Sequence, residues 1–447
     1  HLADDLLNEV TGLVEAPTAL RGHFEEEHLK LPSEVLISVM KKHQRYFPLQ
    51  KNGNLLPYFI TVRNGDDRYL DVVSDGNAQV IRARFADAAF FIREDLQQPL
   101  AAYLPKLGTL VFQIKLGTML DKSQRILGLV KDLEPLFELS DQECSLTERA
   151  AELCKADLVS QMVIEMTSLQ GVMGRYYALN SGEDPQVAEV LFEHYLPRFT
   201  GDQVPQSKAG LLVGIADRLD SLAGLFAAGL APTGTKDPFA QRRAAIGLVQ
   251  ELMTWDLDFD LARGLELAGQ HLPLPTTPEV QAACLDFIVG RMRNLLIDVD
   301  GYRYDIVDAV LAEQRQNPAG ALRAIRQLTQ GAARPDWSAI LPGYARCVRI
   351  TRDQKQRFEV RPEWMTDPAE TALWGALQTA EAAVRLPGSV DDLFNAFLPM
   401  LPAINTYFDK VMVMAEDPAV RSSRLGLLQR IAALASGVAD LSLMEGF

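Results

Sequence analysis

Three segments of this sequence carry the residues that come nearest to a catalytic set. They contribute Asp157, His194 and Asp217, each on a predicted helix. Carboxylate oxygens and imidazole nitrogens are ligands with which proteins hold a metal ion that activates water for hydrolysis. Such a site needs about three well-placed ligands and a vacant position for the water. These side chains are the most that a hydrolytic site here could use, and the alternative is that the carboxylates are structural.

The order of these residues resembles that in HD-domain phosphohydrolases, helical proteins in which a His, an adjacent His-Asp pair and a later Asp hold the metal. In this sequence Ala156 precedes Asp157 where the family has histidine, and no histidine lies between His43 and His194. The resemblance implies a degenerate HD-like fold kept as a scaffold, with no metal bound, and its motif positions are Ala156, Asp157, His194 and Asp217. An HD-type metal-dependent phosphohydrolase is the alternative.

Motifs of other enzyme classes are missing from the sequence. It contains no GxxxxGK[ST] phosphate loop, no GxGxxG after a strand, no HExxH and no GxSxG. Nothing resembles the HIGH and KMSKS sequences that mark a common class of ATP site. We therefore predict no catalytic residue in this chain.

Composition indicates a multidomain globular protein without a membrane span. The 447 residues are too many for one ordinary core and carry a net charge of -15. No apolar run reaches the roughly 18 residues that a membrane-spanning helix needs. Four cysteines stand far apart, without a CxxC pair or a secretory segment before them, which favours a reducing cytoplasm.

Basic residues are concentrated in places despite the acidic total. Residues 35–65 hold five bases and no acid, a pattern that suits a phosphate-bearing partner or, alternatively, a solvated surface. A second basic pair, Arg242 and Arg243, follows a flexible loop near a predicted helix start, with Asp237 as the expected N-cap and Pro238 as the first helical residue. Cations are unfavourable there, so this pair is expected to bind a phosphate or a carboxylate.

Periodicity predicts an α+β region followed by helices. Residues 36–40 and 58–62 are expected to form a strand pair, and residues 78–94 a helix. From about residue 115 the pattern is helical almost to the end, with a bend expected near Pro399 and Pro402. The helical segments are expected at residues 115–133, 145–166, 185–194, 208–230, 239–255, 278–298, 306–316, 319–330, 368–385, 390–416 and 418–441.

Several ordered segments resemble bacterial glycyl-tRNA synthetase β subunits. They are VLISVMKKHQRYFP at residues 35–48, FQIKLGT at 112–118, LQGVMGRYY at 169–177 and KDPFAQRR at 236–243. The sequences FDKVMVM at 408–414 and RSSRLGLL at 421–428 also resemble the DALR-type helical anticodon-binding domain, although the Asp-Ala-Leu-Arg string itself is absent.

This resemblance implies a division of labour within an α2β2 heterotetramer. A separate α subunit uses ATP with Mg and glycine, while the β subunit holds tRNA(Gly) and binds no cofactor itself. The chain begins at His1 within a predicted helix and the family's β subunits are longer at the N-terminus, so we expect an N-terminally truncated fragment. The expected domains are an α+β domain at residues 1–115, an HD-like helical domain at 116–235, a helical connecting region at 236–334 and a DALR-like anticodon-binding domain at 335–447.

The tRNA-binding residues are expected at two ends of the chain. The acceptor side is expected near Lys41, Lys42, Arg45, Arg242 and Arg243, and the anticodon side near Lys410, Arg421 and Arg424. Tyr344 and Tyr407 are candidates for stacking on unpaired bases. An editing domain in the N-terminal region and a pure scaffold that bridges α subunits are the remaining alternatives.

Overall fold

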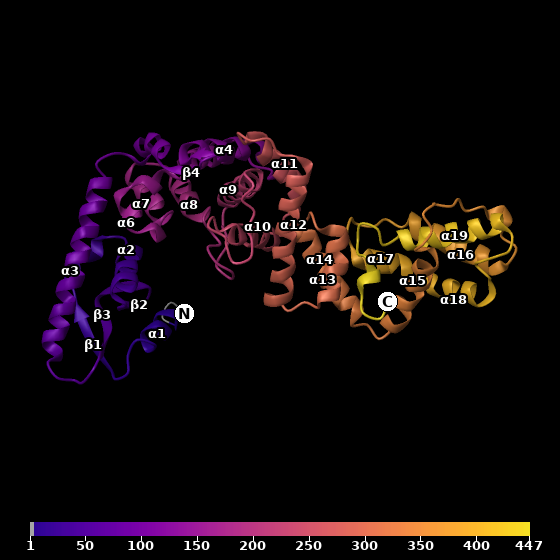
Figure 1. Ribbon diagram of the computed structural model, residues 1–447, viewed down its shortest axis with the longest axis horizontal. Coiled ribbons are helices and arrows are strands. Elements are labelled where there is room, and N and C mark those ends of the chain that lie inside the picture. The colour runs from indigo at the N-terminus through magenta and orange to yellow at the C-terminus, as the bar shows by residue number, and fades with distance from the viewer. Residues whose placement is uncertain (1–3) are drawn as a thin grey trace. The chain divides into compact units, whose positions relative to one another are not determined.

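The computed structural model describes residues 4–447, which divide into two compact units (Figure 1). The first unit consists of the described residues up to Leu196 together with Gln203–Asp220 and His271–Leu274. The second comprises Pro197–Asp202, Ser221–Gln270 and Pro275–Phe447. The predicted class is confirmed at the level of a mainly helical chain with a small antiparallel sheet near its start.

A three-stranded antiparallel sheet opens the first unit after helix α1 (Asp4–Thr11). Its strands are β1 (Pro17–His23), β2 (Phe47–Lys51) and β3 (Asn54–Asn64), in the order β1-β3-β2. Asn52 and Gly53 join β2 to β3 with φ of 52° and 82°, the left-handed conformation that a tight hairpin requires. Helix α3 (Leu70–Asp95) packs on β1, which confirms the helix predicted at 78–94.

The strand predicted at residues 36–40 is wrong, because these residues are helical. They lie in α2 (Ser33–Ser38) and in the π-helical turn Val39–His43. The buried residues of this segment include Val35, Leu36, Val39 and Met40. They form two adjacent pairs that are four residues apart, which places them on one side of a helix. The strand predicted at 58–62 is confirmed within β3, where it pairs with β1 on one side and β2 on the other.

The remaining elements of the first unit are short helices and one hairpin. The helix predicted at 145–166 is interrupted, because α5 ends at Leu153 and Ser160 caps the next helix by accepting from the N–H of Val163. The elements are β4 (Val111–Gln113), β5 (Gly117–Thr118), α4 (Met119–Leu133), α5 (Asp141–Leu153), α6 (Gln161–Glu165), α7 (Val172–Asn180), α8 (Pro185–Glu193) and the first part of α9 (Lys208–Ala227).

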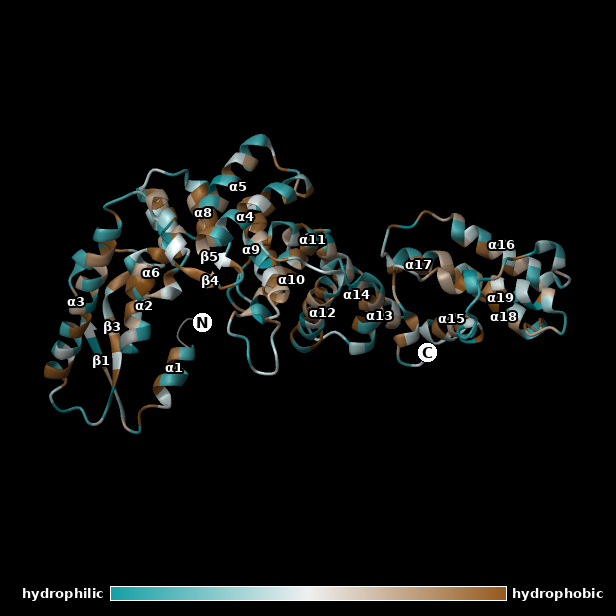
Figure 2. Ribbon diagram, turned by 45° about the horizontal axis from the view of Figure 1, so that its top comes forward, coloured by the Kyte–Doolittle hydropathy of each residue, from teal (hydrophilic) through white to brown (hydrophobic). Residues whose placement is uncertain are grey.

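Past α9 the second unit is helical, and its helices carry hydrophobic and hydrophilic residues together, as amphipathic helices do (Figure 2). The bend predicted near Pro399 and Pro402 is confirmed, since a 3-10 turn at Leu398–Met400 separates α17 from α18. The helices are α10 (Gln241–Thr254), α11 (Leu261–His271), α12 (Pro278–Asn294), α13 (Tyr304–Gln314), α14 (Pro318–Ala332), α15 (Trp337–Thr351), α16 (Pro368–Ala382), α17 (Val390–Phe397), α18 (Leu401–Lys410) and α19 (Pro418–Ala433).

Among the helices from Asp4 onward, none is both long and apolar enough to cross a membrane.

Helix α19 packs closely on the backbone before α16. A Cβ on Gly426 would lie 2.7 Å from the carbonyl oxygen of Phe358, whereas one on Gly375 in α16 would meet nothing within 4 Å. We expect Gly426→Ala to lower the free energy of unfolding by about 1–3 kcal/mol through overpacking. Gly375→Ala should instead raise it by about 0.5–1 kcal/mol through helix propensity. Denaturant unfolding of both variants checks this, and equal effects of the two substitutions would contradict the packing at Gly426.

Candidate functional site

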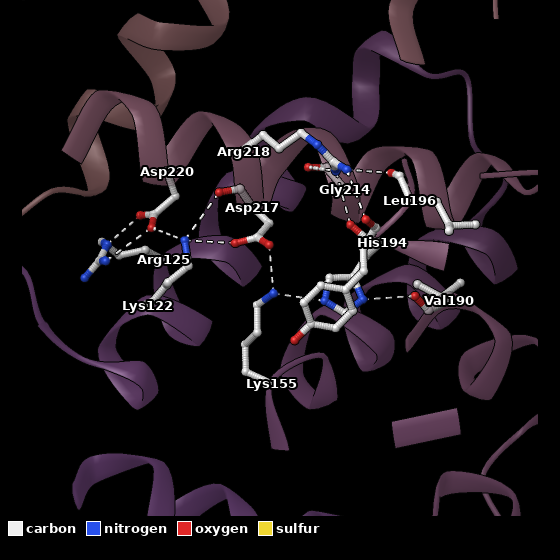
Figure 3. Close-up of polar contacts among 11 residues, drawn as sticks. Lys122, Arg125, Lys155, Val190, His194, Leu196, Gly214, Asp217, Arg218 and Asp220 are labelled. Carbon is white, nitrogen blue, oxygen red and sulfur yellow. Dashed lines mark hydrogen bonds and ion pairs between the residues drawn. The ribbon is translucent and has the colours of Figure 1, made fainter. Parts of the chain in front are cut away.

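Two basic residues on α4 meet two carboxylates on α9 in the interior of the first unit (Figure 3). Lys122 Nζ lies 2.8 Å from Asp217 Oδ1 and 2.9 Å from Asp220 Oδ2. Arg125 Nε lies 2.6 Å from Asp220 Oδ1. Each pair is spaced three residues apart along its helix, so both members lie on one face. The two helices are thereby joined by a buried ladder of ion pairs.

Lys155, just after α5, connects this ladder to the end of α8. Its Nζ lies 2.7 Å from Asp217 Oδ2 and 2.9 Å from His194 Nε2 (Figure 3). His194 Nδ1 lies 3.3 Å from the carbonyl oxygen of Val190. A carbonyl can only accept, so Nδ1 carries the ring proton and Nε2 accepts from the Lys155 ammonium group.

Burial and charge shape the protonation states of this cluster. Burial by itself would raise the pKa of Asp217, but the ammonium groups of Lys122 and Lys155 hold it well below its usual value. Burial and the neighbouring Lys155 charge lower the pKa of His194 well below 6.5. Although burial opposes it, the Asp217 and Asp220 carboxylates raise the pKa of Lys122. At neutral pH Lys122 and Asp217 are therefore charged and His194 is neutral.

Arg218 completes the cluster through main-chain contacts. Its guanidinium donates to the carbonyl oxygens of Gly214 at 3.0 Å, His194 at 3.1 Å and Leu196 at 2.6 Å. The bonds to His194 and Leu196 satisfy carbonyl groups at and just after the end of α8, where intrahelical donors run out, and the bond to Gly214 lies within α9. The side chain thus fastens the end of α8 to α9.

The arrangement favours a structural role over hydrolysis. The Lys155 ammonium group occupies the position between Asp217 and His194 that a shared metal ion would need, and it uses the lone pair of the imidazole. Among the side chains that the structure describes, no group of three His, Cys, Asp or Glu residues could hold a metal ion.

Asp157, the third predicted member, is engaged elsewhere. Its Oδ2 accepts from the backbone N–H groups of Gly171 at 2.7 Å and Gly174 at 3.0 Å, at the start of α7. Burial raises the pKa of this carboxyl to about 6, with the two N–H groups acting in the opposite direction. The neighbouring Ala156 is fully buried. The structure therefore brings His194 and Asp217 together and uses Asp157 to cap a different helix.

The predicted acceptor-side residues near the N-terminus differ in their exposure. Lys42 is exposed and Lys41 is half-buried, and burial lowers the pKa of Lys41, which Asp5 partly offsets. Arg45 Nε lies 2.6 Å from Glu9 Oε1, and both side chains are about half exposed. The side chain of His43, in the same segment, lies outside the described atoms. Lys42 is therefore the cation of this group that the structure leaves most accessible.

The loop before α10 binds the first residue of the arginine pair. Helix α10 begins at Gln241 with Ala240 as its N-cap, so the N-cap predicted at Asp237 and the start predicted at Pro238 are wrong. The Asp237 side chain nevertheless reaches the first turn. Its carboxylate accepts from the N–H groups of Gln241 at 2.8 Å and Arg242 at 2.9 Å. The Arg242 guanidinium donates to the carbonyl oxygen of Gly234. Arg243 is exposed.

The structure favours packing roles for two predicted anticodon-side tyrosines. Tyr407 is fully buried, and Tyr344 is 7% exposed with its hydroxyl donating to the carbonyl oxygen of Ala432 at 2.8 Å. Neither ring stands on the surface where a base could stack on it. Burial of the aromatic surface accounts for both residues.

Two predicted anticodon-side arginines on α19 contact neighbouring residues of the chain itself. Arg424 Nε lies 2.7 Å from Glu370 Oε1, and its Nη1 donates to the carbonyl oxygen of Met412 at 2.8 Å. Arg421 donates to the carbonyl oxygen of Ala415 at 3.4 Å. Both therefore hold the extended segment after α18, while Lys410 at the end of that helix is exposed.

Comparison with known proteins decides the family. A sequence model described as "Glycyl-tRNA synthetase beta subunit" matches residues 1–312. The chain belongs to the glycyl-tRNA synthetase beta subunit family. It is 43% identical over 449 residues to the "Glycine--tRNA ligase beta subunit" of Moorella thermoacetica, covering 98% of this chain and 64% of that protein.

Other relatives of this family member agree. The beta subunit of Desulfitobacterium hafniense strain Y51 is 40% identical over 99% of this chain and 65% of its own length. The "Glycine--tRNA ligase, chloroplastic/mitochondrial 2" of Arabidopsis thaliana is 40% identical over 99% of this chain and 42% of its own length. The chain thus spans just under two thirds of the length of the beta subunits it matches.

In this member of the glycyl-tRNA synthetase beta subunit family, a group of basic residues on α15 and the segment after it lies outside the predicted site residues. We call it the α15 basic strip. The signal was present, since residues 346–357 hold five bases and one acid. The helix itself was not predicted, so the spacing of these residues on one element was missed. The strip consists of Arg346, Arg349, Arg352, Lys355 and Arg357.

Replacement of Asp157 tests its capping role. We expect Asp157→Ala to lower the free energy of unfolding by about 2–4 kcal/mol, because two buried N–H groups lose their acceptor. Asp157→Asn should cost less, since an amide oxygen still accepts. Asp184→Ala removes the exposed cap of α8 and should cost about 1 kcal/mol. Calorimetry or denaturant unfolding measures all three, and an Ala loss no larger than the Asp184 loss would contradict the assignment.

The buried neutral His194 predicts a pH dependence. Its pKa is depressed in the fold, so the unfolded chain binds the extra proton as pH falls below about 6.5, and stability falls with it. Each pH unit below that point should shift the unfolding equilibrium roughly tenfold in the parent relative to His194→Gln. The comparison with the variant cancels the opposite contribution of Asp157, whose raised pKa makes stability fall as pH rises from about 4 to 6. Hydrogen exchange of α8 and α9 amides at pH 5.5 and 7.5, in the parent and in His194→Gln, supplies the measurement. If protection changed between the two pH values by the same factor in both proteins, the prediction would be contradicted.

Proposed function

We propose that this chain is a tRNA-holding part of a glycine–tRNA ligase β subunit, which positions tRNA(Gly) for ATP-dependent glycylation at the active site of an α subunit. The observation that carries the proposal is the family match over residues 1–312, together with the relatives at about 40% identity across nearly the whole chain. The sequence also lacks the nucleotide-binding motifs that an activating site of the common kinds would have.

The proposal assigns ATP with Mg to the α subunit and no cofactor to this chain, within an α2β2 assembly. We place the protein in the cytoplasm, which suits the free state of Cys144, Cys154, Cys284 and Cys347. The acceptor side of the tRNA would lie near Lys41, Lys42, Arg45, Arg242 and Arg243, and its anticodon side near Lys410, Arg421 and Arg424.

Four domains belong to the same proposal. They are the α+β domain at residues 1–115, the HD-like helical domain at 116–235, the connecting region at 236–334 and the DALR-like anticodon-binding domain at 335–447. The ion-pair cluster supports a scaffold role for the HD-like domain, because Lys155 fills the gap between Asp217 and His194. No observation in the described residues favours the phosphohydrolase or the editing alternative.

A charging assay tests the division of labour. The α subunit and tRNA(Gly) would be incubated with ATP and glycine, in the presence or absence of full-length β subunit. This 447-residue chain would be assayed for charging by itself. Its binding of a tRNA(Gly) transcript would be measured separately. We expect charging only with α and β together, and binding without charging by this chain alone. Glycylation by this chain alone would overturn the account. Absence of tRNA binding would favour the scaffold alternative, in which the chain only bridges α subunits.

A further inference from the structure

The α15 basic strip stands out because its charges lack carboxylate partners. Across the part of the chain that the structure describes, none of its five side chains forms an ion pair. By contrast, eight partly exposed arginines of the second unit each form an ion pair with a carboxylate. They are Arg263, Arg293, Arg303, Arg315, Arg323, Arg334, Arg361 and Arg430. In a chain with 59 acidic and 44 basic residues, a run of uncompensated cations requires a separate reason.

Aromatic rings support the strip instead of carboxylates. The Arg346 guanidinium carbon lies 5.0 Å from the centre of the Phe408 ring, and those of Arg349 and Arg352 lie 5.4 and 5.8 Å from the centre of Phe447. Such contacts orient a guanidinium group without neutralising its charge. Arg346 also donates to Asn405 Oδ1, so its side chain is held from two directions.

The rings themselves rest on the core. The ring centres of Phe447 and Tyr344 are 6.5 Å apart, and those of Tyr344 and Phe397 are 5.8 Å apart. Both pairs are arranged edge to face. Tyr344 and Phe397 are buried. Four of the five basic residues of the strip are exposed and Arg346 is partly buried. Phe447, which lies under Arg349 and Arg352, is connected through Tyr344 to the packed interior.

The geometry suits a nucleic acid better than a simple acidic surface. A guanidinium group held against a ring still presents its other face, on which a base can stack, and its N–H edges, which bind phosphate. Arg346, Arg349 and Arg352 are spaced three residues apart, roughly 4.5 Å along a helix axis. The three side chains therefore follow one another along one side of α15 and its C-terminal cap.

We propose that the α15 basic strip is an RNA-contacting surface. Arg349, Arg352, Lys355 and Arg357 contact phosphates of a single-stranded loop, and Arg346 on Phe408 stacks against an unpaired base. The inference rests on the proposed function, for which it supplies a surface on the C-terminal domain.

The test compares two triple variants of the whole chain with equal changes in charge. Arg349→Gln/Arg352→Gln/Arg357→Gln removes three charges from the strip, whereas Arg263→Gln/Arg315→Gln/Arg334→Gln removes three that are paired with carboxylates. Binding of a tRNA(Gly) transcript is measured at several salt concentrations. Each lost single-strand phosphate contact should lower the slope of log affinity against log salt by about 0.7. The strip variant should therefore lose about 2 in slope and on the order of a hundredfold in affinity at ~0.1 M salt, and the control variant much less.

A third variant separates stacking from charge. Phe408→Leu keeps every cation, so it should weaken binding severalfold and leave the salt slope unchanged; thermal unfolding verifies that each variant is folded. If the parent binds RNA and the strip variant matches it in affinity and slope, the strip assignment is wrong while the proposed function stands. If the parent binds no tRNA, the proposed function itself fails. Equal binding of poly-glutamate would overturn the RNA assignment, because charge alone would then explain the surface.

Discussion

The Asp217 carboxylate imposes the strongest constraint on the first unit. Its side chain is only 15% exposed, and a carboxylate so far removed from water is tolerated only when cations and hydrogen bonds surround it. Here the cations come from two other elements, Lys122 on α4 and Lys155 after α5. Hydrophobic contact between helices tolerates some sliding, but an ion pair with Nζ to oxygen distances of 2.7 to 2.8 Å does not. Asp217 therefore helps to fix α4 and the end of α5 against α9. Asp220 adds two further ion pairs to α4, and Arg218 binds the end of α8.

Buried carboxylates serve a second structural purpose nearby, which is to cap helices from outside. Asp95, at the end of α3, accepts from the N–H groups of Gln161 at 2.8 Å and Met162 at 3.0 Å, at the start of α6. Asp157 does the same for α7. Short helices leave a large share of their N–H groups without partners, so a unit built from such helices needs acceptors supplied by neighbouring elements. This accounts for the burial of Asp95 and Asp157 in the first unit.

Sequence periodicity located most helices because their burial has one clear side. It succeeded for α8 and α10, whose predicted ranges differ from the observed ones by a few residues. It failed at residues 36–40, where a short β-branched run hid a helical spacing of buried residues, and at residues 145–166, where Ser160 starts a new helix. The order of motifs grouped Asp217 with His194, and in the structure both contact Lys155. The role of Lys155 did not, because which cation reaches a buried carboxylate depends on tertiary contacts between α5 and α9.

The same limit governs the assignment of RNA-binding arginines, since a sequence shows charge but not pairing. The sequence predicts Arg424 to be an exposed cation on an amphipathic helix. In the structure its guanidinium group instead donates to Glu370 and to a main-chain carbonyl. Arg349 carries the same charge, and within the described residues it contacts an aromatic ring and forms no ion pair. A phosphate gains little from an arginine that must first leave a carboxylate, because the ion pair it breaks offsets the one it makes. An acidic protein can therefore bind a polyanion at a surface whose cations are not paired, because its acidic residues are paired with other cations. The net charge of -15 does not determine the affinity of one such unpaired strip.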